Sequence, residues 1–261
     1  MTQKRALVTG AGARLGRAMA IRLAEKGYDV AVHYASSAEG AEATAEAIRA
    51  LGRKAVTLRA DLLSEAEVDA LVPAAMAALG GPITCLINNA SIFEYDTYRT
   101  ATRESWDRHI GSNLRAPFVL TQAVARHIPD PTIDDHGEPV AQGLIVNMLD
   151  QRVRKLTPEF TTYTIAKMGL WAMTQTAAQG LAPKIRVNAI GPGPTLRGHR
   201  QTQDHFDRQR QSTILRRGAN PEDVIASLTY LLDAPSVTGQ LICVDGGQHL
   251  AWQTPDVLGV E

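Results

Sequence analysis

The first thirty-four residues constrain the fold of this chain more than any other segment. Arg5-Ala-Leu-Val-Thr-Gly10 reads as a short apolar strand that enters a glycine turn, and a helix is predicted from Arg14 to Ala24. The glycines of Thr9-Gly-Ala-Gly-Ala-Arg-Leu-Gly16 let the backbone approach a pyrophosphate, and the start of the helix aims amide groups at it. A second strand, Asp29 to Tyr34, completes a strand, turn, helix, strand unit typical of dinucleotide-binding folds.

Strand-like and helical runs alternate along the remaining chain. Strands are predicted at Ala6 to Thr9, Asp29 to Tyr34, Ala55 to Arg59, Cys85 to Asn88, Gly143 to Asn147, Arg186 to Ile190 and Gln240 to Val244. Further helices are predicted at Ala41 to Leu51, Glu65 to Leu79, Arg103 to His127, Phe160 to Leu181 and Pro221 to Leu232. Seven strands in this order imply a Rossmann-type, doubly wound parallel sheet. The 261 residues, 44% of them hydrophobic, suffice for a single α/β domain spanning residues 1–261.

Two segments read as loops. Residues 129–140 are rich in Pro, Asp and Gly, which predicts a polar surface excursion. Residues 191–218 leave the carboxyl end of a strand through Gly-Pro-Gly-Pro and become polar. Because α/β proteins place substrate loops at that end of the sheet, residues 191–218 are the candidate substrate lid.

The residues after the second strand favour NADP over NAD. An acid there would bind the ribose 2′-hydroxyl and repel a 2′-phosphate, but the chain reads His33-Tyr-Ala-Ser-Ser37. We therefore expect cofactor contacts from His33, Tyr34, Ser36 and Ser37. Arg14 is a candidate phosphate clamp, with a solvated first-turn arginine as the alternative.

Tyr163-Thr-Ile-Ala-Lys167 couples a phenol to a cation. Positions i and i+4 share a helix face, so the Lys167 ammonium is expected beside the Tyr163 ring, where it would favour the ionised phenol. A phenol pKa of roughly 10 would then move toward neutrality, which suits proton exchange with a substrate. Taken alone, the pair also fits two ordinary surface neighbours.

Five motifs together resemble the classical short-chain dehydrogenase/reductases over nearly the whole chain. They are Thr9-Gly10 to Gly16, Asn88-Asn-Ala90, Asn113, Tyr163 with Lys167, and Pro192-Gly193. The resemblance implies that Tyr163 is the catalytic acid, that Lys167 holds the nicotinamide ribose, and that Asn113 supports a water-linked proton relay. It also implies cofactor contacts from Gly10, Leu15, Gly16, Asp61, Leu62, Asn89, Ala90, Ser91, Tyr163, Pro192, Gly193 and Thr195.

Asp150 departs from the general family, most members of which carry serine at that position. A serine hydroxyl can steady a forming alkoxide, whereas a carboxylate would repel it. A carboxyl group instead suits a substrate whose acceptor atom is a ring nitrogen. The alternative for Asp150 is a capping or turn acid near a strand end.

The aspartate, Arg14-Leu-Gly16, His33-Tyr34 and Asn89-Ala-Ser-Ile-Phe93 resemble the pteridine reductases. The dihydromonapterin reductases show a similar acidic replacement. The likeness implies that Phe93 lies over a pterin, that Ser91 contacts substrate and cofactor, and that Asp150 and Tyr163 form the donor pair for a C=N bond. Phe93 is alternatively an ordinary core or lid aromatic.

The expected function is therefore NADPH-dependent reduction of a dihydropterin, folate or related ring. The first alternative is a carbonyl reductase of the same fold, such as a 3-oxoacyl-thioester reductase. The second is a non-catalytic NADP-binding regulatory protein. The resemblance further implies a homotetramer, formed through the helix that carries Tyr163 and the helix that follows Asn113.

Composition argues against several other classes. The net charge is zero, with 27 basic and 27 acidic residues, which provides no broad footprint for nucleic acid or an anionic membrane. No apolar run approaches the roughly 18 residues of a membrane span. Cys85 and Cys243 lie in apolar contexts and suggest reduced thiols of a cytoplasmic protein. His199 and His205 lie in a polar Arg/Gln segment, and no metal is expected.

Overall fold

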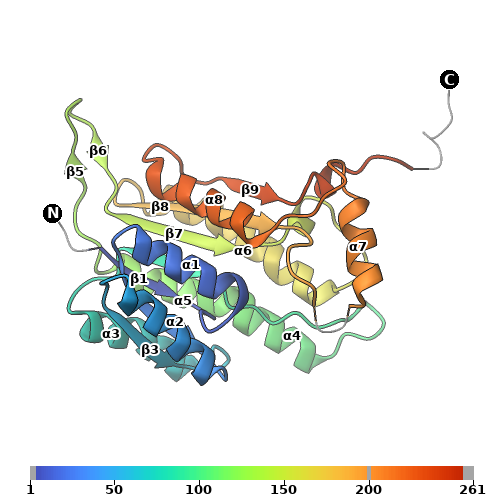
Figure 1. Cartoon of the computed structure of the whole chain (residues 1–261), viewed down its shortest axis with the longest axis horizontal. Coiled ribbons are helices and arrows are strands. Elements are labelled where there is room, and N and C mark those ends of the chain that lie inside the picture. The colour runs from blue at the N-terminus through green and yellow to red at the C-terminus, as the bar shows by residue number, and fades with distance from the viewer. Residues whose placement is uncertain (1–3, 199–200, 255–261) are drawn as a thin grey trace.

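The central element of the structure is a seven-stranded parallel sheet with the order β3-β2-β1-β4-β7-β8-β9 (Figure 1). The computed structural model describes residues 4–198 and 201–254. The seven strands are β1 (Arg5–Val8), β2 (Asp29–Tyr34), β3 (Ala55–Arg59), β4 (Cys85–Asn88), β7 (Gly143–Met148), β8 (Ile185–Pro192) and β9 (Leu241–Val244). Every pair of neighbouring strands is parallel. The predicted doubly wound sheet is therefore confirmed, with strand ends within two residues of those expected.

Helices cover both faces of this sheet (Figure 1). One face packs against α1 (Arg14–Glu25), α2 (Ala38–Ala50) and α8 (Pro221–Asp233), and the other against α3 (Glu65–Leu79), α5 (Ala116–Ala125) and α6 (Thr161–Gly180). Successive side chains of a strand point to opposite faces, so Val8 joins the first core and Leu7 the second. This alternation explains why β1 is buried on both sides and reads as a continuous apolar run.

The strand order reverses between β1 and β4. From β1 the chain moves outward through β2 to β3, and it then returns to place β4 on the opposite side of β1. The connections leaving β1 and β4 therefore diverge at their carboxyl ends. Open α/β sheets bind ligands in the crevice that this divergence creates.

The helix predicted from Arg103 to His127 consists of three parts. These are α4 (Arg103–Ile110), a five-residue π-helical turn η1 (Gly111–Arg115) and α5. A π-turn inserted in an α-helix often marks a functional site. Here it contains Asn113, which is fully buried.

The segment 129–140 is more ordered than the sequence predicted. It contains an antiparallel hairpin of β5 (Thr132–Ile133) and β6 (Pro139–Val140). The Asp134 carboxylate accepts hydrogen bonds from the backbone N–H groups of His136 and Glu138, both at 2.9 Å. These local bonds hold the turn, although the composition alone suggested only a loop.

The candidate lid at 191–218 also contains a helix that the sequence did not predict. This helix, α7 (Gln203–Gln211), begins where the Thr202 hydroxyl accepts a hydrogen bond from the N–H of His205. Within α7 only Phe206 is buried, so the apolar periodicity that reveals other helices is missing. Residues 199–200 of the predicted lid, including His199, lie outside the described residues.

Two short 3₁₀ turns complete the fold. They are η2 (Gln151–Val153), directly after Asp150, and η3 (Gln248–Leu250). Cys85 and Cys243 are free thiols, and burial raises the pKa of Cys85 to about 12. Within residues 4–198 and 201–254, no helix is long and apolar enough to span a membrane.

Candidate active site

Hydrogen bonds tie the ends of β1 and β4 together at the reversal point of the sheet. The Thr9 hydroxyl accepts from the N–H groups of Asn89 and Ala90, both at 2.9 Å. In return the Asn89 amide donates to the carbonyls of Thr9 and Gly10, at 2.8 and 3.2 Å. These four bonds fix the glycine turn against the start of the segment that follows β4.

The glycine turn is packed so closely that side chains would not fit. A Cβ on Gly16 would lie 2.2 Å from the Gly10 carbonyl oxygen, and one on Gly40 would lie 2.3 Å from that of Gly12. The helix α1 begins after Ala13, whose methyl group cannot cap the first backbone N–H groups. An uncapped helix start behind a tight glycine turn fits the pyrophosphate of a dinucleotide.

His33, a predicted cofactor contact, has a buried side chain that binds the backbone of the glycine turn. Its side chain is 1% exposed, and its Nδ1 accepts a hydrogen bond from the Gly10 N–H at 3.0 Å. The other nitrogen, Nε2, therefore carries the proton and donates to the Ala60 carbonyl at 3.0 Å. Burial lowers the pKa of His33, which keeps the ring neutral. The histidine supports the glycine turn from beneath.

Several other predicted cofactor residues lie at the ends of β2 and β3. Tyr34 is half-buried, whereas Ser36, Ser37 and Asp61 are exposed there. The Asp61 carboxylate accepts a hydrogen bond from the backbone N–H two residues later, at 2.9 Å. Leu62 is instead buried in the second core, so its side chain is directed away from solvent.

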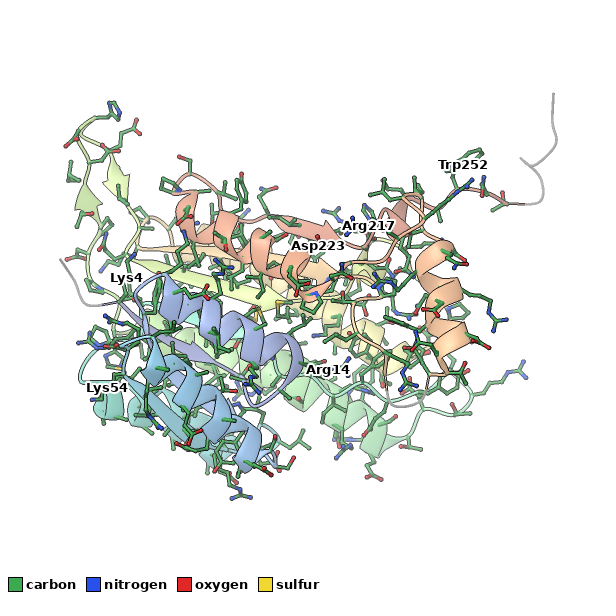
Figure 2. All side chains as sticks on the ribbon, in the orientation of Figure 1. Lys4, Arg14, Lys54, Arg217, Asp223 and Trp252 are labelled. Carbon is green, nitrogen blue, oxygen red and sulfur yellow. The ribbon has the colours of Figure 1, made fainter. Side chains whose placement is uncertain are left out.

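Arg14 has a position that neither sequence interpretation described. It lies near the start of α1, on the side of the molecule that faces α7 (Figure 2). Its guanidinium donates to the carbonyls of Leu196 and Arg197, both at 3.1 Å. Arg14 thus joins the glycine turn to the segment after β8. Leu15, the next residue, is partly buried against the first core.

The turn after β8 belongs to the segment that Arg14 joins to the glycine turn. Pro192 ends β8, and a Cβ on Gly193 would approach the Asp245 Cβ to 2.6 Å. The Thr195 hydroxyl donates to the Gly193 carbonyl at 3.1 Å, so it stabilises its own turn. The close contact with Asp245 explains why glycine is required at residue 193.

The structure brings Asp150 and Tyr163 together across thirteen residues of sequence. The Tyr163 hydroxyl donates to Asp150 Oδ2 at 3.2 Å, and the tyrosine is 5% exposed. The second oxygen, Oδ1, accepts the backbone N–H of Arg152 at 2.8 Å, which caps η2. Asp150 therefore acts as a capping acid and a partner of Tyr163 at once.

The electrostatics of Tyr163 differ from the sequence expectation. Burial, followed by the negative charge of Asp150, raises the Tyr163 pKa well above its ordinary value, and Arg152 and Ser91 only partly oppose this. Lys167 does lie beside the ring, with Nζ 5.7 Å from its centroid. However, Lys167 donates to the Met148 carbonyl at 2.7 Å, and burial lowers its own pKa to about 8. Tyr163 thus remains a protonated phenol, suited to donate.

The lowered pKa of Lys167 predicts a pH dependence. Lys167 carries its positive charge below about pH 8 and loses it above that value. Because that charge would hold a cofactor hydroxyl and favour proton loss from Tyr163, we expect kcat/KM to fall as pH rises through about 8. Initial rates from pH 6 to pH 10, with circular dichroism to confirm folding, would measure this. A flat profile above pH 8 would contradict the role of Lys167.

An aromatic cluster lies beside Tyr163. Phe93 is 50% exposed, stacks on Phe160 with ring centroids 4.4 Å apart, and meets the Tyr163 ring edge-on at 4.7 Å. The guanidinium of Arg152 lies over Phe160 at 5.0 Å. Arg152 and Phe160 lie within three residues of the predicted site residues Asp150 and Tyr163. The cluster presents a half-exposed, flat ring next to a proton donor.

Asn113 and Ser91 flank the start of the segment that carries Phe93. The Asn113 side chain accepts the Ile92 N–H at 2.9 Å and donates to the Ile92 carbonyl at 2.8 Å. Both ends of this amide are therefore engaged with the backbone of one residue. Ser91 is exposed, and its hydroxyl is 3.4 Å from the Ile92 carbonyl. Asn113 fixes the path of the chain after β4.

Comparisons with known proteins find similar chains that match nearly the whole length of this one. A family model described as enoyl-(acyl carrier protein) reductase matches residues 10–249. The crystal structure of FolM alternative dihydrofolate reductase 1 from Brucella suis, in complex with NADP, is 41% identical, with a TM-score of 0.89 over 97% of this chain and 98% of that one. A short chain dehydrogenase from Burkholderia cenocepacia J2315, also in complex with NADP, is 32% identical, with a TM-score of 0.84 over 94% and 98% of the two chains.

A sequence relative points to a different substrate. The 3-oxoacyl-(acyl-carrier-protein) reductase FabG of Staphylococcus epidermidis is 31% identical over 252 residues, which cover 95% of this chain and 99% of FabG. The relatives thus include proteins named for folate reduction and for carbonyl reduction.

Proposed function

Because this chain belongs to the short-chain dehydrogenase/reductase family, we propose that it is an NADPH-dependent reductase that converts a dihydropterin or folate-type ring to its tetrahydro form. It is an NADP-dependent oxidoreductase, in keeping with similar structures that are in complex with NADP. The contact between the Asp150 carboxylate and the Tyr163 hydroxyl carries the assignment of the substrate. The similarity to FolM from Brucella suis supports it.

Different site residues would bind different parts of the cofactor. When bound, NADPH would supply a hydride from C4 of its nicotinamide. The uncapped start of α1 and the turn from Gly10 to Gly16 would receive the pyrophosphate. Lys167 would bind the nicotinamide ribose, and exposed Ser36 and Ser37 would face the 2′-phosphate. Arg14 would reach that phosphate by exchanging the carbonyls of Leu196 and Arg197 for it.

The protonation step follows from the charges at Asp150 and Tyr163. Reduction of a C=N bond needs a proton on nitrogen while the hydride reaches the neighbouring carbon. Tyr163 stays protonated because burial and Asp150 raise its pKa, so its hydroxyl is available as the donor. The Asp150 carboxylate orients that hydroxyl and attracts a basic heterocycle. A forming alkoxide would instead face like charge at Asp150, which disfavours carbonyl substrates.

The aromatic cluster suits a flat substrate. Phe93 is half-exposed, and its ring stacks on the ring of Phe160. A planar ring that stacks on Phe93 would have an edge near the Tyr163 hydroxyl, because Phe93 and Tyr163 are in edge-on contact. We place Ser91 beside the substrate and the cofactor in the same arrangement.

Carbonyl reduction is the second candidate, because FabG from Staphylococcus epidermidis is similar over nearly the full length. A non-catalytic, NADP-binding protein is the third, and it would bind cofactor without turnover.

The absorbance of NADPH should be followed on adding dihydrobiopterin, dihydrofolate or dihydromonapterin, with an acetoacetyl thioester as the carbonyl substrate. Turnover of a dihydropterin supports the proposal, whereas turnover of the thioester alone moves the enzyme to carbonyl reduction.

Substitutions of Asp150 distinguish dihydropterin reduction from carbonyl reduction. In Asp150→Asn the side chain keeps an acceptor for the Arg152 N–H but loses its charge. We expect kcat for dihydropterins to fall by about 100-fold, since a positioned acid–base group contributes about 10²- to 10⁴-fold. In Asp150→Ser we expect any thioester reduction to survive or increase. Asp134→Asn in the β5–β6 hairpin is the matched control, and unchanged dihydropterin turnover in Asp150→Asn would refute the assignment.

The assembly and location of the enzyme belong to the same proposal. We place a homotetramer in the cytoplasm, acting on a small molecule without a nucleic-acid or membrane partner. The subunits would associate through α6 and α5, where Phe118 on α5 is 42% exposed. Light scattering after size-exclusion chromatography measures the oligomeric state, and a monomer would exclude the tetramer.

A further inference from the structure

We propose that Asp96, His109 and Thr162 form a buried clamp that positions Tyr163 relative to Phe93. The Asp96–His109–Thr162 clamp joins three separate segments, namely the chain after β4, the end of α4 and the start of α6. Its residues are positioning residues that act through Tyr163 and Phe93. The inference rests on the proposed function, in which Tyr163 donates a proton to a ring that stacks on Phe93.

The direction of each hydrogen bond in the clamp is determined. The Glu94 backbone N–H can only donate, and it donates to His109 Nε2 at 3.1 Å. The proton of the neutral imidazole is therefore on Nδ1, which donates to the Thr162 hydroxyl oxygen at 2.7 Å. The Thr162 hydroxyl in turn donates to Asp96 Oδ2. Asp96, His109 and Thr162 are 2%, 0% and 2% exposed, so water does not compete for these bonds.

Asp96 also caps the helix that carries Tyr163. Phe160 precedes α6 in a left-handed conformation, and its aromatic side chain cannot accept the first helical N–H groups. Asp96 supplies acceptors instead. Its Oδ1 takes the Thr162 N–H at 3.1 Å, and its backbone carbonyl takes the Thr161 N–H at 3.3 Å. A carboxylate at a helix start is favoured by the helix dipole.

Hydrogen-bond donors around Asp96 stabilise its negative charge. Burial alone would raise its pKa, but hydrogen bonds from the Thr162 hydroxyl, the Thr162 N–H and the Ser105 hydroxyl outweigh burial and lower the pKa. The Ser105 bond is 3.0 Å long. Leaving such a buried charge without its donors is costly, so Asp96 fixes the position of Thr162 strongly.

The clamp matters because Tyr163 is next to one of its residues and Phe93 is next to a residue that it binds. Tyr163 follows Thr162, and Phe93 precedes Glu94, whose N–H is bound by His109. On the other side of Phe93, Ile92 is held by Asn113. The segment 92–96 is thus attached to the π-turn, to α4 and to α6. A shift of the stacking ring against the proton donor by about 1 Å can cost about 100-fold in rate.

The experiment removes one hydroxyl from the clamp. Thr162→Val keeps the shape and the backbone N–H but loses the link between His109 and Asp96. We expect kcat to fall by about 10- to 100-fold with the KM for NADPH unchanged, because the cofactor site lies outside the clamp. Thr162→Ser restores the hydroxyl and should restore kcat to near wild type. The matched control is Thr121→Val on α5, since the buried Thr121 hydroxyl finds no hydrogen-bond partner among the described residues.

Amide hydrogen exchange provides a readout that needs no substrate. Exchange of residues 92–97 should be faster in Thr162→Val and in His109→Phe than in Thr121→Val. His109→Phe keeps a ring beside Tyr163, where the present centroid distance is 6.0 Å, but removes the acceptor of the Glu94 N–H. It serves as the second variant if Thr162→Val does not fold.

The outcomes separate the clamp from the substrate assignment. If the wild type reduces the thioester and no dihydropterin, the proposed function fails, and kcat on the thioester together with exchange still measures the clamp. If both Thr162→Val and His109→Phe keep wild-type kcat and wild-type exchange, the clamp is overturned. A drop in kcat that Thr162→Ser does not rescue also overturns it, because the hydroxyl would then not be responsible.

Discussion

Tyr163→Phe is expected to lower kcat for dihydropterin reduction by about 10²- to 10⁴-fold, which is the usual contribution of a positioned proton donor. The substitution removes only the hydroxyl that donates to Asp150 Oδ2 at 3.2 Å. The remaining ring can keep its edge-on contact with Phe93 and its place beside Lys167. Stopped-flow or steady-state measurement of NADPH oxidation gives the rate.

Two controls separate chemistry from folding in this variant. NADPH affinity, measured by fluorescence titration, should be unchanged, because the hydroxyl is bound to Asp150. Tyr98→Phe, at a residue that is 83% exposed, should keep wild-type turnover and thermal stability. Wild-type turnover in Tyr163→Phe would remove the tyrosine from the protonation step and leave Asp150 as the donor.

Gly16→Ala adds a single methyl group, and we expect it to lower the affinity for NADPH. The new Cβ would lie 2.2 Å from the Gly10 carbonyl oxygen and 2.6 Å from the Asn89 amide nitrogen. Because the first contact is with backbone, the glycine turn must shift. Overpacking of this kind costs about 1–3 kcal/mol, which corresponds to roughly 5- to 150-fold weaker NADPH binding if the strain falls on the binding conformation.

Calorimetry or fluorescence titration with NADPH measures this effect, and thermal unfolding measures any loss of stability. Gly180→Ala is the matched control, since a Cβ at the end of α6 would meet open space among the described residues. There the substitution should be neutral or slightly stabilising, because alanine favours helix. NADPH affinity equal to wild type in Gly16→Ala would show that the turn adapts and that its packing does not control binding.

The sequence predicted the sheet well because the β strands are short, apolar and separated by helical segments. It missed α7 because that helix buries only Phe206 and is otherwise polar. It missed the β5–β6 hairpin because each of its strands has only two residues and both strands are largely exposed. Periodicity reports burial, so elements with little burial leave no signal in the pattern of apolar residues.

For the site, the sequence predicted which residues carry the chemistry but not the burial and hydrogen bonds that set their properties. It placed Lys167 beside Tyr163, yet it predicted a lowered phenol pKa where burial and Asp150 raise it. It predicted a cofactor contact from His33 but not that the His33 side chain is buried and accepts a hydrogen bond from the Gly10 N–H. Both differences arise because burial and the direction of hydrogen bonds depend on neighbours that are distant in the chain.

The sequence by itself determined the fold class, the seven strands and the glycine turn, because these depend on local patterns of apolar residues and glycine. Only the tertiary structure decided that Phe160 stacks on Phe93 and that Asp96, His109 and Thr162 form one buried chain of hydrogen bonds. The physical reason is that these contacts join residues up to 67 positions apart, and their energies depend on short distances and exclusion of water. The short distances and the exclusion of water are established only when the strands and helices have packed.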